Sequence, residues 1–166
     1  MNKKHNIYEL AERLGRKVWE KNGLKRIYIN DGYNTEKMST TTFIWQDESG
    51  EFKVNCYIEC PSQPWNWIKS QKEIVISNVE EEVRHALVDF FYMPVRKIDG
   101  MVFDNGIMES REEFILYPDV YLSEDNVIKD LKKYSENPEE YEIVAISRKD
   151  AEKESEEAWH IKRKQD

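Results

Sequence analysis

The sequence predicts an α+β protein: an antiparallel sheet, made of a three-stranded meander and further short strands, covered on one face by an N-terminal helix and a long central helix. Three observations predict this fold. Apolar and polar residues alternate over residues 52–59, residues 39–46 are rich in β-branched and aromatic side chains, and apolar residues recur at helical spacing over residues 6–21 and 64–91. The 166 residues are expected to form a single domain with a charged helical C-terminal tail from about residue 147.

The N-terminal helix is expected over residues 6–21, where Ile7, Leu10, Leu14 and Val18 share one face. The Asn-Gly pair that follows favours the left-handed backbone that ends a helix. The meander then has strands at residues 24–30, 39–46 and 51–59, and a tight Asp-Glu-Ser-Gly connection joins the last two as a hairpin.

The long central helix is expected over residues 64–91, with Ser62 as a candidate N-cap. It should end before Met93, because the residue ahead of a proline disfavours helical backbone. Trp65 and Trp67 lie about 200° apart around such a helix, so both cannot face one core. At least one of the two tryptophans is therefore expected to be accessible.

Residues 95–122 are expected to add two or three short strands joined by Asp-Gly and Asn-Gly turns. Ser123 can cap a short helix that ends at Asn137 and Pro138, residues 141–146 are a further strand, and Ser147 can cap the final charged helix. The expected core residues are Val18, Ile27, Ile29, Phe52, Val54, Cys56, Ile68, Val79, Val83 and Leu87.

The charge of the chain is unevenly distributed along the sequence. The net charge is −8, yet residues 1–30 carry eight basic side chains against three acidic ones, and residues 73–142 carry eighteen acidic side chains against seven basic ones. Such an asymmetry can indicate one face for a polyanion and another for a basic partner, but solvated faces that simply differ in charge are the simpler explanation, and we favour it.

Several functional classes find no support in the sequence. No apolar run is long enough to span a bilayer and the N-terminus lacks the features of a secretory signal, so we expect a cytoplasmic protein that has no membrane partner. Cys56 and Cys60 are expected to be reduced, because their spacing fits neither a zinc knuckle nor an unstrained bridge. The sequence contains neither of the two glycine-rich phosphate-binding patterns, Gly-x4-Gly-Lys-(Ser/Thr) and Gly-x-Gly-x2-Gly. We expect no cofactor and no metal.

A metal-dependent hydrolase or nuclease is the weakest of three functional hypotheses. It is motivated by five acids in the strand-rich region, Asp99, Asp104, Glu112, Glu113 and Asp119. The Pro118–Asp119 pair is similar to the start of the PD-(D/E)xK nuclease signature. The acid-x-Lys pair of that signature should follow on a strand, but the chain turns into a helix there, so no site residues are carried over and no catalytic residue is assigned.

A second hypothesis is a protein that binds single-stranded nucleic acid. Basic side chains lie where the first helix enters the first strand, and aromatic side chains lie on strands, where they can stack against bases. The candidate residues are Lys17, Lys21, Lys25, Arg26, Tyr28, Trp45 and Tyr57. Lysine and arginine stems also cover apolar surface on ordinary helices, and the acidic total opposes general polyanion binding.

The hypothesis that the sequence favours is a small acidic protein-binding or inhibitory module without catalytic activity, of the kind found among bacterial, phage or other mobile-element accessory proteins. Its contact surface would combine an accessible tryptophan with an acidic helix face, because tryptophan dominates many interfaces. The candidate residues are Trp65, Trp67, Glu80, Glu81 and Glu82. The partner would be an unidentified protein, and no motif indicates an oligomeric state.

Overall fold

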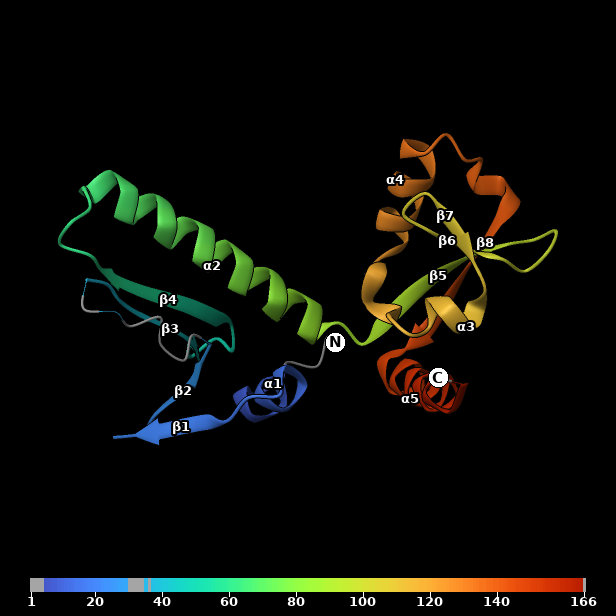
Figure 1. Cartoon of the computed structure of the whole chain (residues 1–166). Coiled ribbons are helices and arrows are strands. Elements are labelled where there is room, and N and C mark those ends of the chain that lie inside the picture. The colour runs from blue at the N-terminus through green and yellow to red at the C-terminus, as the bar shows by residue number, and fades with distance from the viewer. Residues whose placement is uncertain (1–4, 30–34, 36, 166) are drawn as a thin grey trace. The chain divides into compact units, whose positions relative to one another are not determined.

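A computed structural model describes residues 5–29, 35 and 37–165 (Figure 1). The protein is α+β, as the sequence predicts, and it contains two antiparallel sheets of four strands each. Internal contacts divide the chain into two compact units, Met1–Leu87 and Val88–Asp166, here called unit 1 and unit 2. Each unit has its own hydrophobic core. The single domain expected from the sequence stays a prediction.

Unit 1 has the sheet order β1-β2-β3-β4 with antiparallel pairing throughout, so the expected meander of β2, β3 and β4 is confirmed and carries one extra strand. In Figure 1, α2 runs along β4. The elements of unit 1 are α1 (Ile7–Leu14), β1 (Val18–Lys21), β2 (Leu24–Tyr28), β3 (Ser39–Gln46), β4 (Phe52–Glu59) and α2 (Trp65–Leu87).

The helix expected over residues 6–21 is too long, because α1 ends at Leu14. Gly15 adopts a left-handed backbone with a φ of 66° and donates its N–H to the carbonyls of Ala11 and Glu12, which closes the helix. Residues 18–21 form β1 instead. The Asn-Gly pair turns the chain from β1 into β2, with φ of 55° at Asn22 and 76° at Gly23, the backbone of a two-residue hairpin.

The core of unit 1 lies between one face of its sheet and the two helices. Alternation along the strands directs Ile27, Ile44 and Val54 to the same face, because they are aligned across β2, β3 and β4. This face packs against α1 and α2, as expected from the sequence. The buried cluster comprises Ile7, Leu10, Ala11, Ile27, Ile44, Val79, Val83 and Ala86.

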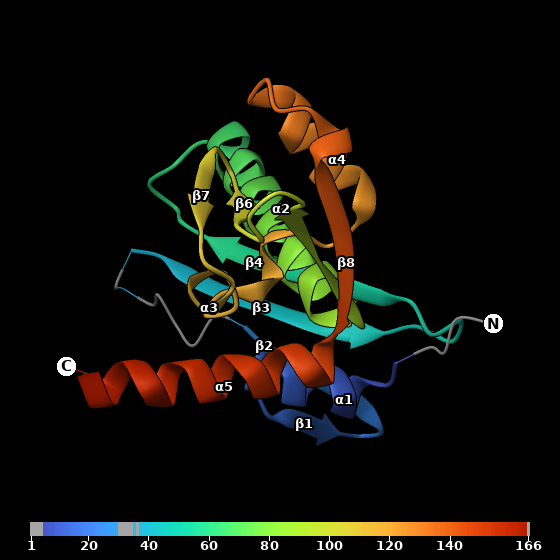
Figure 2. The same cartoon turned by 90° about the vertical axis from the view of Figure 1, so that its right-hand side faces the viewer.

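Unit 2 has the sheet order β7-β6-β5-β8, and Figure 2 shows β8 leading directly into α5. Its main core gathers Met93 and Phe103 of the sheet with Val127 and Leu131 of α4. The elements are β5 (Phe90–Arg96), β6 (Val102–Asp104), β7 (Ile107–Glu109), α3 (Arg111–Phe114), η1 (Pro118–Val120), α4 (Glu124–Lys133), η2 (Pro138–Glu140), β8 (Tyr141–Ser147) and α5 (Arg148–Gln165).

The central helix ends at Leu87 rather than near residue 91, and the chain continues as β5 through Pro94. Tyr92 and Arg96 donate their N–H groups away from β8, to the carbonyls of Tyr121 and Met101. Because N–H groups point the same way at every second residue, the nitrogen of Pro94 also faces away from β8. The β5–β8 ladder therefore loses no hydrogen bond, and a proline is tolerated inside the strand.

The strands and turns expected over residues 95–109 are present, but residues 112–122 form α3 and η1 rather than a strand. Ser110 caps α3 by accepting the N–H of Glu113. Ser123 caps α4 in the expected way, and Ser147 accepts the N–H of Asp150 at the start of α5. None of the helices in the described ranges is both long and apolar enough to cross a membrane.

Four of the ten expected core residues are buried, namely Ile27, Cys56, Val79 and Val83. The other six are half-buried, mostly because they lie at the margins of the sheet of unit 1 or, like Ile68, on the first half of α2. Every buried residue of α2 lies in its second half. The sequence pattern is therefore a good guide to the face of each element and a poorer guide to the depth of burial.

Candidate nucleic-acid interface

The face of the unit 1 sheet opposite α1 and α2 carries a stripe of aromatic rings from three neighbouring strands. Tyr28 of β2 lies opposite Phe43 of β3, and their ring centroids are 5.9 Å apart. Phe43 stacks on Tyr57 of β4 with a centroid separation of 6.1 Å and an interplanar angle of 26°. The outer ring of this stripe, Tyr57, is 56% exposed. We call this stripe the aromatic platform.

Basic side chains border the aromatic platform. The guanidinium carbon of Arg26 lies 4.5 Å from the ring centroid of Phe43, so the cation packs on the face of that ring. The Nζ of Lys17, just before β1, lies 4.6 Å from the ring centroid of Trp19 on that strand. Trp19 pairs with Arg26 across the hairpin and is 55% exposed. Aromatic rings and cations therefore alternate across the part of this face that β1, β2 and β3 form.

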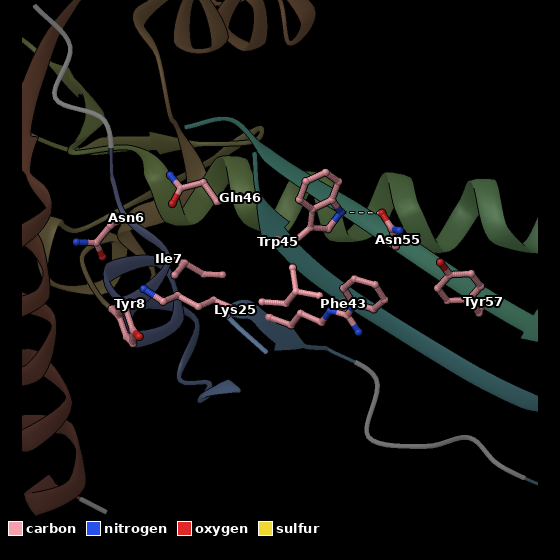
Figure 3. A pocket seen from close by; sticks show the side chains of 12 residues that line it. Asn6, Ile7, Tyr8, Lys25, Phe43, Trp45, Gln46, Asn55 and Tyr57 are labelled. Carbon is pink, nitrogen blue, oxygen red and sulfur yellow. Dashed lines mark hydrogen bonds between the residues drawn. The ribbon is translucent and has the colours of Figure 1, made fainter. Parts of the chain in front are cut away.

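A groove of about 630 Å³ opens beside the aromatic platform (Figure 3). The Nε1 of Trp45 donates a hydrogen bond of 2.8 Å to the Oδ1 of Asn55, which fixes the indole ring at the wall of the groove. The Nζ of Lys25 lies 5.0 Å from the ring centroid of Tyr8. The lining residues come from α1 and its N-cap, from the β1–β2 turn and from three strands: Asn6, Ile7, Tyr8, Gly23, Leu24, Lys25, Arg26, Phe43, Trp45, Gln46, Asn55 and Tyr57.

A second groove, of about 450 Å³, lies on the β1–β2 hairpin. It shares Leu24 and Arg26 with the first groove and also contains Trp19, Lys21 and Tyr28. Six of the seven residues proposed for nucleic-acid binding from the sequence thus line these two adjoining grooves. The seventh, Lys17, contacts the rim of the second groove through the ring of Trp19.

The residues proposed for protein binding from the sequence are spread along α2. Trp65 is 65% exposed and has Lys72 over its ring at 5.6 Å, whereas Trp67 is half-buried. Glu80, Glu81 and Glu82 are exposed near the other end of the helix, and Glu81 pairs with Arg84 at 3.4 Å. Fifteen residues of helical rise separate Trp65 from Glu80, or about 22 Å, so the structure does not bring the two halves of this set together.

The acidic residues of unit 2 include one carboxyl group, that of Glu109, with an unusual pKa. Burial and the neighbouring Asp104 raise the pKa of Glu109 to about 7, because both disfavour its charged form. Asp99 is held by Arg96 through hydrogen bonds of 3.0 and 3.1 Å, which lowers its pKa. Within the described ranges, no group of three or more His, Cys, Asp or Glu side chains is arranged to hold a metal ion.

The sequence analysis does not predict four of the groove residues, namely Tyr8, Trp19, Phe43 and Asn55. The sequence pattern predicts one long helix that contains both Tyr8 and Trp19. For Phe43, the alternation along its strand indicates only that it shares a face with Trp45. The Asn-Gly pair at 22–23 is the one signal that predicts the hairpin. Such a pair is typical of a turn between two strands, and that interpretation places Trp19 on the sheet.

A comparison of the chain with models of protein families, with curated proteins and with solved structures found no match.

Proposed function

We propose that unit 1 binds single-stranded nucleic acid on the aromatic platform and the grooves beside it. The observation that carries this proposal is the convergence of Tyr28, Phe43 and Tyr57 with Arg26 on the sheet face opposite the helices. Bases of any identity stack on exposed aromatic rings, and basic side chains beside the rings neutralise the phosphates. The proposal therefore predicts binding with little sequence preference.

The distribution of charge between the units removes the main objection to this proposal. Residues 1–87 carry 13 basic and 13 acidic side chains, whereas residues 88–166 carry 12 basic and 20 acidic ones. The entire net charge of −8 thus belongs to unit 2. Unit 1 is balanced overall, so the local basic residues of the platform are not opposed by an acidic surplus in their own unit.

The test is the affinity of the full chain for a fluorescein-labelled thymidine decamer, measured by anisotropy at low salt. Tyr57→Ala removes an exposed ring from the platform and should weaken binding by about 1–3 kcal/mol, the typical contribution of one stacked base. Tyr117→Ala is the matched control, since this tyrosine of unit 2 is also well exposed, at 62%. It should leave the affinity unchanged.

Equal affinities of the Tyr57→Ala variant and the wild-type protein would show that the decamer binds outside the aromatic platform. An absence of binding to DNA and RNA decamers alike would overturn the proposal for single strands as a class. Circular dichroism of both variants excludes a loss of fold as the cause of weaker binding.

A second candidate function is protein binding through the first half of α2, with no catalytic activity. It is favoured by the exposure of a large apolar side chain at the start of that half, Trp65, at 65%. Exposed tryptophans are over-represented among residues that dominate interface energy. The acidic run Glu80–Glu82 would be a separate contact on such a partner.

This second function is tested by affinity capture from nuclease-treated lysate with the wild-type protein, Trp65→Ala and Glu81→Gln as baits. A protein that the wild type retains and Trp65→Ala loses would support the α2 surface. Identical captures by all three baits would exclude both Trp65 and Glu81 from the contact.

A further inference from the structure

We infer that the groove between β2 and β3 is a pocket for one unstacked nucleobase of the bound strand. This inference rests on the proposed function and adds to it a site that borders the aromatic platform, sharing Phe43 and Tyr57 with it but not Tyr28. Its basis is a fork between the two strands, polar backbone groups that face into the fork, and aromatic rings on two of its walls.

The fork is a break in the strand ladder. β2 and β3 pair at Tyr28–Phe43 and Ile27–Ile44, and Ile29 donates its N–H to the carbonyl of Thr42. In the same register the next hydrogen-bonded pair would be Lys25 with Gln46. The pairing of the described strands stops before that point, and both Lys25 and Gln46 line the groove instead.

The backbone groups of these two residues face into the fork. In the β1–β2 hairpin, Lys21–Leu24 is the hydrogen-bonded pair next to the two-residue turn, so Lys25 directs its N–H and C=O away from β1. Gln46 has the same parity as Ile44, which bonds toward β2. The fork thus offers two donors and two acceptors at fixed positions, the combination that reads the edge of a base.

The walls of the groove suit a flat aromatic ligand. Trp45 is fixed by its hydrogen bond to Asn55, and Tyr8 is half exposed on α1 with Lys25 over its ring (Figure 3). Asn55 accepts that bond through its Oδ1, and its side chain lines the groove. The volume of about 630 Å³ lies in the range typical of small-molecule sites.

A base fits this fork better than an extended peptide does. Strand addition needs a row of unpaired backbone groups along one edge, and the fork offers only Lys25 on one side and Gln46 on the other before the turns at residues 22–23 and 47–50. The cations at the rim, Lys25 and Arg26, also match a phosphate backbone that leads one base into the pocket.

The test uses a decamer of abasic deoxyribose phosphates that carries one 2-aminopurine in the centre, with a fully abasic decamer as the reference strand. Wild-type protein should bind the aminopurine strand at least tenfold more tightly than the abasic strand, with a change in aminopurine fluorescence. Tyr8→Ala, which alters an exposed ring at the wall, should remove most of this tenfold preference. Tyr28→Ala should keep it, because Tyr28 belongs to the platform and does not line this groove.

The outcomes separate the pocket from the proposed function. A preference that Tyr28→Ala removes and Tyr8→Ala keeps would assign the base to the platform and overturn the pocket. A thymidine decamer that fails to bind would overturn the proposed function itself. Displacement of the aminopurine strand by an extended octapeptide of alternating valine and threonine, at equal affinity, would assign the fork to peptides.

Discussion

Phe43 is buried although it lies on the sheet face opposite the two helices of unit 1. The side chains around it provide the cover: Arg26 packs on its ring, Tyr57 stacks on one side and Tyr28 contacts the other. The platform is therefore a small apolar cluster with an exposed rim. Its central ring contributes to stability, while its outer ring is available for a ligand.

Phe43→Ala and Tyr57→Ala should differ strongly in stability for this reason. Truncation of a buried phenylalanine lowers the free energy of unfolding by about 3–5 kcal/mol, whereas loss of the exposed ring of Tyr57 should cost less than about 1 kcal/mol. Urea unfolding followed by circular dichroism measures both. Equal losses in the two variants would show that the platform is not organised around Phe43.

Glu109 should make stability depend on pH near neutrality. Its pKa is about 7 in the folded protein against an ordinary value of 4.5, so the folded state holds this proton more tightly than the unfolded state. The associated stability is fully present below about pH 4.5 and is lost as the pH rises through 7. Glu109→Gln removes the charge, and with it the decrease in stability that accompanies the rise in pH.

The Glu109→Gln variant should therefore gain stability over the wild type at pH 8 relative to pH 5, by on the order of 1 kcal/mol after solvent screening. Urea midpoints at the two pH values give the comparison, with Glu124→Gln on the exposed start of α4 as a control. A difference that is the same at both pH values would assign the effect to something other than the titration of Glu109.

At the level of elements, the sequence predicts strands and turns better than helix ends. The alternation in residues 52–59 identifies β4 to within one residue, because period-2 burial leaves few alternatives. Both helix errors come from apolar residues that continue a helical spacing by chance. Val18 extends the pattern of α1 past Gly15, and Phe90 extends that of α2 past Leu87, although both belong to strands.

The candidate site was only partly predictable for the same reason. Tyr28, Trp45 and Tyr57 follow from strand alternation, because it places each on the face away from the core. The contribution of α1, through Tyr8, depends on how the helix packs after Gly15 ends it. The fork depends on where two strands separate, and no local pattern in β2 or β3 encodes that separation.

Two hairpin glycines allow a matched test of the turns. Gly23 in the β1–β2 turn and Gly106 in the β6–β7 turn both have positive φ, so an alanine at either is strained by about 1–2 kcal/mol. An added Cβ meets open space at Gly23, but at Gly106 it would lie 3.0 Å from the ring of Tyr134. Gly106→Ala should therefore destabilise the protein more than Gly23→Ala in urea unfolding. The reverse order would contradict the described β6–β7 turn.

At the scale of the whole molecule, the total charge conceals how the charge is divided. A polyanion-binding surface on a chain of net charge −8 is unexpected from composition alone. It becomes physically reasonable once the contacts divide the chain into a balanced unit 1 and an acidic unit 2. The sequence contains this asymmetry, but the boundary at Leu87 lies inside the helix expected over residues 64–91 and is absent from the sequence pattern.

The most direct test of nucleic-acid binding by unit 1 is the salt dependence of thymidine-decamer affinity for the wild type, Lys21→Gln, Arg26→Gln and the α2 control Lys69→Gln. The affinity of the wild type should fall steadily on a logarithmic scale as salt rises, because bound phosphates release counterions. Lys21→Gln and Arg26→Gln should each flatten the slope by about one counterion or less, and Lys69→Gln should not. A slope that is the same in all four proteins, or no binding at low salt, would contradict nucleic-acid binding by this face of unit 1.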